Sequence, residues 1–114
     1  MDTSPALGGQ QLVIGAGDIG DRSREPMHAG VTYTILWRQD RDAAGVMWID
    51  AGAEVPEHRH ADAEHHIWLS EGRANVDGRV VGPGSYWHVP AGVAHSVSAA
   101  GPDGATLFYL YLRR

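Results

Sequence analysis

Short segments rich in β-branched and aromatic residues recur roughly every ten residues from Val31 onward, and turns that contain Gly or Pro separate them. They cover 31–38, 46–51, 66–69, 75–76, 79–81, 86–89, 94–97 and 106–112. No segment of useful length shows helical periodicity, whereas the 15 glycines and 6 prolines suit many tight turns. We therefore predict an all-β domain that closes into a barrel or a sandwich.

The length of the chain indicates a single domain, because 114 residues can bury one hydrophobic core but hardly two. Residues 1–29 fit no strong periodic pattern, so we expect an N-terminal arm with at most a short strand, at 11–14. Residues 30–114 form the predicted barrel. Its last strand, TLFYLYL at 106–112, is apolar on both faces, which in so small a barrel favours a homodimer.

Charge and composition exclude several classes of partner. The formal net charge is -5 and the 9 basic residues are all arginines spread along the chain, which argues against binding nucleic acid. No apolar run approaches the ~18 residues that cross a membrane, and the N-terminus does not resemble a signal peptide, so we expect a cytoplasmic protein without membrane contact. Because cysteine is absent, histidines and carboxylates must hold any metal.

Three glycines in VIGAGDIG at 13–20 match the dinucleotide-binding pattern G-x-G-x-x-G: Gly15, Gly17 and Gly20. That pattern requires a helix that begins at the glycines within a βαβ unit. The residues that follow, DRSREPMHAG, are polar and include Pro26, and the chain does not alternate strands with helices. We therefore expect neither a helix nor a dinucleotide site here.

Four of the 7 histidines lie within EHRHADAEHH at 57–66. On a strand, side chains two positions apart share a face, so His58 and His60 point together as a natural pair of ligands. ADA or ADAE then has the composition of a turn, and HHIWLSEG reads as the returning strand. If His65 faces inward, His66 faces outward; if Glu64 faces inward, the assignment reverses, and alternation alone does not decide.

A second segment, YWHVPAGVAH at 86–95, adds His88 and His95. The P-A-G turn between them combines proline's fixed φ with glycine's freedom and should direct His95 toward the sheet interior. Imidazoles that converge from two hairpins predict a metal site. We expect His66 and His88 to lie outside it, either on the outer face or as partners of the ligands. One or two aromatic residues should border a ligand cavity, but the sequence does not say which.

These two segments resemble the motifs of the cupins. The first motif, G-x5-H-x-H-x3,4-E-x6-G, is matched by Gly52, His58, His60 and Gly72. The second, G-x5-P-x-G-x2-H, is matched by Gly84, Pro90, Gly92 and His95 with every spacing intact. The resemblance covers about residues 30–112 and implies a double-stranded β-helix, or jelly-roll barrel, with a metal site and often a dimer.

The carboxylate position of the first motif is ambiguous in this chain. Counting forward from His60 places it at Glu64, and counting back from Gly72 places it at His65. We favour His65, because Trp68 then takes the aromatic position of the family and Ile67 faces inward. The resemblance then implies an all-histidine site for Fe, Ni, Cu, Zn or Mn, with Glu64 beside it as a partner or as a catalytic base. The predicted metal ligands are His58, His60, His65 and His95.

The cupin fold serves many functions, so the site must decide among them. Our first hypothesis is a divalent-metal-dependent enzyme, of dioxygenase type, that acts on a small oxygen-rich organic substrate. The second is a cyclase, isomerase or lyase in which the ion acts only as a Lewis acid, for instance in natural-product tailoring. The third, from another class, is a module that binds a metal or a small ligand without turning it over.

Overall fold

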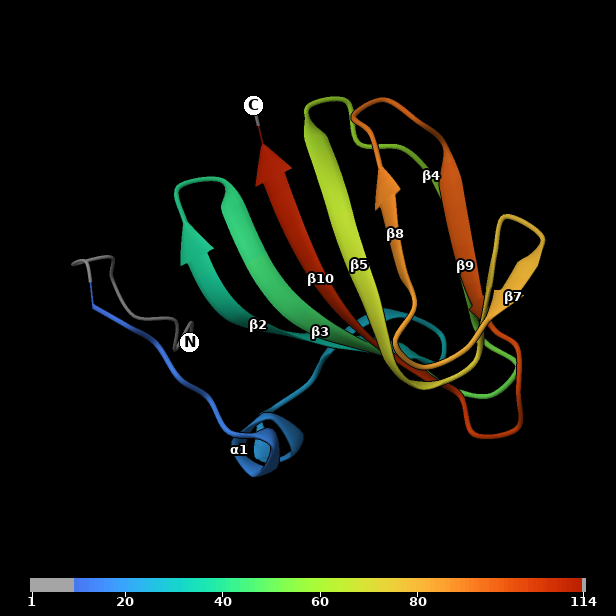
Figure 1. The fold of residues 1–114 in the computed structure, drawn as a ribbon, viewed down its shortest axis with the longest axis horizontal. Helices are drawn as coiled ribbons and strands as arrows, with labels where there is room; N and C mark the ends of the chain where they lie inside the picture. Colours follow the sequence, from blue (N-terminus) through green and yellow to red (C-terminus); the bar gives the residue numbers. More distant parts are fainter. Residues whose placement is uncertain (1–9, 114) are drawn as a thin grey trace.

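The computed structural model describes residues 10–113 and arranges them in two antiparallel sheets (Figure 1). The larger sheet has the order β1-β2-β3-β10-β5-β8, and the smaller has the order β4-β9-β6-β7. The strands of the larger sheet are β1 (Glu25–His28), β2 (Val31–Gln39), β3 (Asp42–Ile49), β10 (Ala105–Arg113), β5 (Ala63–Gly72) and β8 (Tyr86–Val89). Those of the smaller sheet are β4 (Glu54–His58), β9 (His95–Ala99), β6 (Ala74–Val76) and β7 (Arg79–Val81). The two sheets make the predicted all-β jelly roll.

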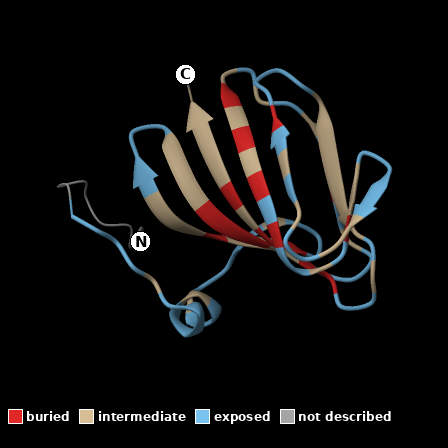
Figure 2. Cartoon of the chain, viewed as in Figure 1, coloured by how far each residue is buried: buried red, intermediate tan, exposed pale blue. Residues whose placement is uncertain are grey.

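The core lies between the two sheets, and alternation along each strand fills it. The largest fully buried side chains are those of Val31, Val46, Ile49 and Leu69. Figure 2 shows the alternation most clearly along β5, where buried and more exposed positions follow one another. Each inward position of β5 faces an inward position of β10, since Leu69 is paired with Leu107 and Ile67 with Tyr109.

Gly72, the last residue of the first motif, lies where the end of β5 comes close to the chain just before β10. Its φ is 78°, a left-handed conformation that residues with a side chain rarely adopt. A Cβ atom at this position would also overlap the backbone carbonyl of Gly104. The end of β5 can therefore lie this close to the chain just before β10 only because this residue has no side chain.

The segment before β2 differs from the prediction. The predicted strand at 11–14 was wrong, because residues 10–15 form no strand, and the short strand of this segment is β1, which pairs antiparallel with β2. A helix, α1 (Ala16–Asp21), begins directly after Gly15, where none was expected. It has only 6 residues and leads into an antiparallel strand, so it does not form a βαβ unit. Within residues 10–113, no helix is long and apolar enough to span a membrane.

Candidate metal centre

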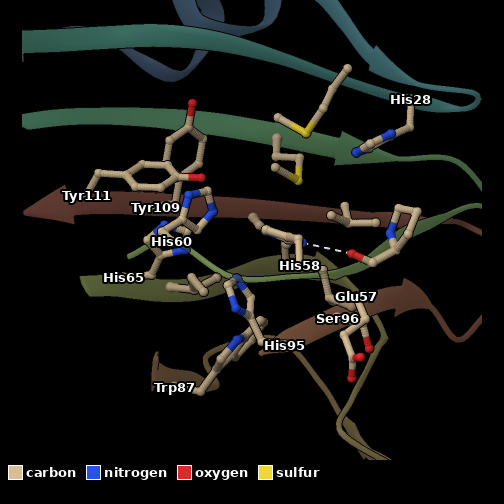
Figure 3. Close-up of a pocket in the computed structure, with 17 residues that line it drawn as sticks. His28, Glu57, His58, His60, His65, Trp87, His95, Ser96, Tyr109 and Tyr111 are labelled. Atoms are coloured by element: carbon tan, nitrogen blue, oxygen red, sulfur yellow. Dashed lines mark hydrogen bonds between the residues drawn. The ribbon is translucent and has the colours of Figure 1, made fainter. Parts of the chain in front are cut away.

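A cavity of about 370 Å³ opens between the two sheets (Figure 3). Its wall is mostly apolar, with Met27, Met47, Val55, Ile67, Trp87, Val97 and Leu107 among the 17 lining residues. The polar residues that line it are five histidines, two tyrosines, Glu57 and Ser96. A cavity of this kind, apolar with a few convergent polar groups, is typical of a small-molecule site.

The four predicted ligands gather at this cavity, three of them from strands and one from the loop after β4. His58 ends β4 and is paired across the sheet with His95, the first residue of β9. His60 follows β4 by two residues, and His65 lies on β5. One ring nitrogen each from His58, His60 and His95 lies within 4.8 Å of the others. The ring of His65 lies beside this group, with its centroid 4.5 Å from that of His60 and 5.2 Å from that of His95.

A backbone hydrogen bond ties the two histidine-bearing segments together. The Gly92 amide donates to the carbonyl of His60 at 2.7 Å, so the turn before β9 is anchored to the chain just after β4. Gly92 has a φ of 79°, which explains why the P-A-G turn needs glycine at this position. The turn therefore fixes His60 and His95 on the same side of the cavity.

Two of the rings are oriented by backbone carbonyls. Nδ1 of His58 lies 2.8 Å from the carbonyl oxygen of Pro56, and Nδ1 of His95 lies 3.1 Å from that of Val93. A carbonyl can only accept, so each Nδ1 carries the proton and donates it. Each Nε2 then keeps a free lone pair, which is the form of histidine that binds a metal ion.

The other two rings leave polar atoms without partners. Nε2 of His60 and Nε2 of His65 are buried and make no hydrogen bond. The His65 side chain is only 4% exposed, and its ring packs edge-on against Tyr111 with centroids 3.6 Å apart. A buried polar atom without a partner costs free energy, and a bound ion is one of the ways in which a protein offsets that cost. A metal ion coordinated by these nitrogens would satisfy both.

Burial disfavours the charged form of three of these histidines. Burial, together with the neighbouring histidines, lowers the pKa of His65 from 6.5 to about 3. The pKa values of His60 and His95 are also lowered, in each case mainly by burial. Imidazoles that resist protonation remain available as ligands near neutral pH.

Two tyrosines of β10 form the wall next to the histidines, and the sequence had not singled them out. Burial raises the pKa of Tyr111 to about 12 and also raises that of Tyr109, so both phenols stay protonated and can donate hydrogen bonds. The signal was present in the alternation of TLFYLYL, where Leu107, Tyr109 and Tyr111 share a face. Both faces of this strand are apolar, so the sequence alone does not say which of them lies inward.

The side chain of Glu64 points away from the cavity. Glu64 and His66 lie on the opposite face of the strand from His65, and Glu64 is not among the lining residues. Its carboxylate contacts His88 of β8 at 3.1 Å. The role of Glu64 as a base at the inner histidines stays a prediction, and this orientation gives it no support. His66 and His88 lie on the outer face, as expected.

Comparison with known proteins agrees with the fold. A family model described as the ChrR cupin-like domain matches residues 16–112. KdgF from Halomonas sp. is 21% identical, with a TM-score of 0.72 over 83% of this chain and 90% of that chain. The polyketide cyclase RemF from Streptomyces resistomycificus is 19% identical, with a TM-score of 0.73 over 90% of this chain and 75% of that chain.

A third similar structure contains a protein complex. The anti-sigma protein ChrR, solved with SigE from Rhodobacter sphaeroides, is 21% identical, with a TM-score of 0.70 over 80% of this chain and 49% of that chain. No curated protein sequence matches the chain. The solved structures share the jelly roll, and the family model spans nearly the whole barrel with both histidine motifs. The chain thus belongs to the ChrR cupin-like domain family of the cupins.

Proposed function

We propose that His58, His60, His65 and His95 hold one divalent transition metal, and that the chain is a metal-dependent enzyme for a small organic substrate. The observation that carries the proposal is the pair of buried, unpartnered Nε2 atoms of His60 and His65, two residues that line a mostly apolar cavity. The donors are all imidazoles, a set suited to Fe, Ni, Cu, Zn or Mn. Four neutral ligands leave the full charge of the ion in place.

The cavity wall indicates the kind of substrate. Apolar side chains such as Met47, Ile67 and Leu107 would contact a hydrophobic body, while the phenols of Tyr109 and Tyr111 would donate hydrogen bonds to its oxygen atoms. A bound divalent ion would supply Lewis acidity and, if it is iron, chemistry with O2. We therefore propose a substrate with adjacent oxygens on an apolar skeleton.

Oxygenase-type chemistry is our first proposal for the reaction. Cyclisation or isomerisation needs a group that moves a proton, and Glu57 is the one carboxylate among the described residues that line the cavity. Glu57 is exposed, whereas the ligand histidines would be occupied by the ion. A non-redox cyclase, isomerase or lyase is the alternative, and it would depend on Glu57 or on a histidine as the base.

A binding module is the second candidate function, and the family itself favours it. The matching model is named after ChrR, and a solved complex shows ChrR as an anti-sigma protein together with SigE. A domain of this family can therefore belong to a protein that acts through a protein partner. In that case the cavity would bind its metal or small ligand without turnover. A partner protein would then bind differently to the occupied and the empty form.

A homodimer is our proposal for assembly. The outer face of β10 carries Phe108, Leu110 and Leu112, which are only half-buried in the single chain. Exposed Trp68 of β5 is paired with Phe108 and extends this apolar surface. A second copy would cover it. Light scattering should give twice the chain mass, and a monomer at all concentrations would contradict this.

The metal site is tested by elemental analysis of the purified protein without an affinity tag. Wild type should retain metal through dialysis, and His60→Ala should retain one equivalent less per chain. His28→Ala is the matched control, because His28 lies at the cavity without belonging to the four-histidine group. Equal metal content in wild type and His60→Ala would refute the site.

The reaction class is tested with the metal-loaded protein. Catechols and 1,3-diketones are suitable probes, because each presents two oxygens to one ion. Oxygen consumption by the iron form would support the oxygenase proposal. Conversion of a probe by the zinc form without oxygen would support the non-redox alternative and contradict the oxygenase. Binding without conversion in every metal form would support the binding module.

A further inference from the structure

A second group of metal-binding side chains lies on the outer face of the larger sheet, where β5 and β8 run side by side (Figure 1). His66 of β5 is the direct cross-strand partner of His88 of β8. Glu64 precedes His66 by two residues and so shares its face. One ligand atom each from Glu64, His66 and His88 lies within 4.8 Å of the others.

The contacts within this group converge on one point. Oε2 of Glu64 lies 3.1 Å from Nε2 of His88, and Oε1 of Glu64 lies 3.8 Å from Nε2 of His66. The two imidazole rings are stacked, with centroids 4.7 Å apart and planes inclined by 28°. The carboxylate therefore faces the same nitrogen, Nε2, of both rings. All three side chains are partly covered, with exposed fractions of 27%, 26% and 37% for Glu64, His66 and His88.

A tyrosine of the same strand pair orients one of the rings. The hydroxyl of Tyr86 lies 2.7 Å from Nδ1 of His66. When Nδ1–H donates to this hydroxyl, Nε2 keeps its lone pair and points toward the carboxylate. This arrangement, in which the far nitrogen of a histidine has a fixed hydrogen-bond partner, is the one that supports ligand histidines in metal sites. Trp68 stacks on the same ring, with its centroid 6.3 Å from that of His66.

We propose that Glu64, His66 and His88 form a second, outer site for a divalent ion of the Zn²⁺ type. Two imidazoles and one carboxylate are a donor set of zinc sites with an open position. The same donors suit Cu²⁺ and Ni²⁺, whereas Mg²⁺ and Ca²⁺ require oxygen ligands throughout. The site is separate from the inner histidines, because His65 lies between Glu64 and His66 in the chain and points to the other face.

The outer ion keeps one position for a further ligand. Three protein donors leave the fourth tetrahedral position open, and the exposed side of His88 gives solvent access to it. Water or a ligand atom from another molecule would complete the coordination. The proposal does not rest on the inner metal, since none of its three donors lines the cavity.

Zinc stoichiometry measured by equilibrium dialysis tests the outer site in the full-length chain. His66→Ala and His88→Ala should each bind one zinc fewer per chain than wild type. Glu64→Gln keeps a hydrogen-bonding side chain beside His88 but loses the charge, and it should weaken this binding more than about tenfold. Trp68→Phe is the matched control, because it changes the neighbouring ring without removing a donor, and its stoichiometry should equal that of wild type.

The fluorescence of Trp68 provides a readout of the outer face. Cu²⁺ bound beside His66 should quench Trp68, and the same quenching step should be missing in Trp68→Phe and in His66→Ala. Excess Mg²⁺ should not reverse it. Zinc binding in His66→Ala, His88→Ala and Glu64→Gln equal to that of wild type would overturn the proposal. His60→Ala distinguishes the two sites, because it should lose only the inner equivalent and keep the quenching of Trp68.

Discussion

Replacing His65 by leucine should stabilise the metal-free protein while it weakens metal binding. The side chain is 4% exposed, and its Nε2 has no hydrogen-bond partner. Leucine has a similar volume and no polar atom, so it removes a buried group that costs about 1–3 kcal/mol. For a domain of this length, 1 kcal/mol corresponds to roughly 4 °C in Tm. The Tm of the metal-free variant should therefore rise by about 4–12 °C at pH 7.5.

The advantage of His65→Leu should grow on acidification. The pKa of His65 is about 3 in the folded protein and 6.5 in the unfolded chain. Between these values the unfolded chain binds a proton that the folded protein does not, so the free energy of unfolding falls as the pH falls. One pKa unit corresponds to about 1.36 kcal/mol, so acidification to pH 5 costs wild type about 2 kcal/mol through this residue. The leucine variant avoids that part of the loss.

Guanidinium unfolding in the presence of EDTA measures both effects, at pH 7.5 and at pH 5. Metal is then added at about 100 times its Kd for wild type, which should stabilise wild type by about 2.7 kcal/mol. The variant should gain less than this. His28→Leu is the matched control, since this exposed histidine lines the cavity but belongs to neither proposed metal site, and it should not produce the stabilisation.

Two results would refute this reasoning. If His65→Leu were less stable than wild type in EDTA, the imidazole would be well satisfied in the metal-free protein, contrary to its unpartnered Nε2. If added metal stabilised the variant as much as wild type, His65 would not be a ligand. The site would then consist of His58, His60 and His95, the three whose nitrogens lie within 4.8 Å of one another.

Three further predictions concern the inner site and its wall. Metal occupancy after dialysis should persist below pH 6.5, because burial lowers the pKa of His60, His65 and His95, and it should be lost as the pH approaches about 3, the pKa of His65; full occupancy below that pH would contradict histidine ligation. Gly45→Ala should destabilise the protein by about 1–3 kcal/mol in guanidinium unfolding, because its Cβ would overlap the Tyr109 hydroxyl; an unchanged midpoint would contradict that packing. Tyr111→Phe should retain metal but bind an oxygen-bearing probe several-fold more weakly, by about 1 kcal/mol for one lost hydrogen bond, and unchanged affinity would remove Tyr111 from the binding site.

The sequence predicted the strands that carry their own hydrophobic pattern and missed those that do not. β7 and β8 have the predicted bounds, and β2 ends one residue beyond its prediction. The sequence missed β1, with EPMH, and predicted β4, with EVPEH, wrongly: a strand with His58 and His60 was expected to form a hairpin with β5, but β4 ends at His58 and pairs with β9. Both contain proline and charged residues and lie at the edges of their sheets, where proline is tolerated. Their conformation depends on pairing with β2 and β9, which no local pattern reports.

The inward face of β5 could not be read from the turn that precedes it. A turn of ADA and a turn of ADAE differ by one residue. That difference decides whether His65 faces inward or whether Glu64 and His66 do. The structure resolves the choice through distant contacts, because β5 is paired on one side with β10 and on the other with β8. The burial of Ile67 and Leu69 fixes the register, and the orientation of the ligands follows.

The packing of the core therefore determines the electrostatics of both proposed metal sites. Shifting β5 by one residue would expose Ile67 and Leu69 and bring Glu64 to the inner face, at a cost of roughly 1.5–3 kcal/mol for each exposed apolar side chain. With the register as it is, a divalent ion inside would keep its charge of +2 among neutral imidazoles, and an ion outside would be partly neutralised by Glu64. The inner ion would then be the stronger Lewis acid, held in an apolar cavity. The same metal on the two faces of one strand would thus have different reactivity, because alternate side chains of β5 supply different donors.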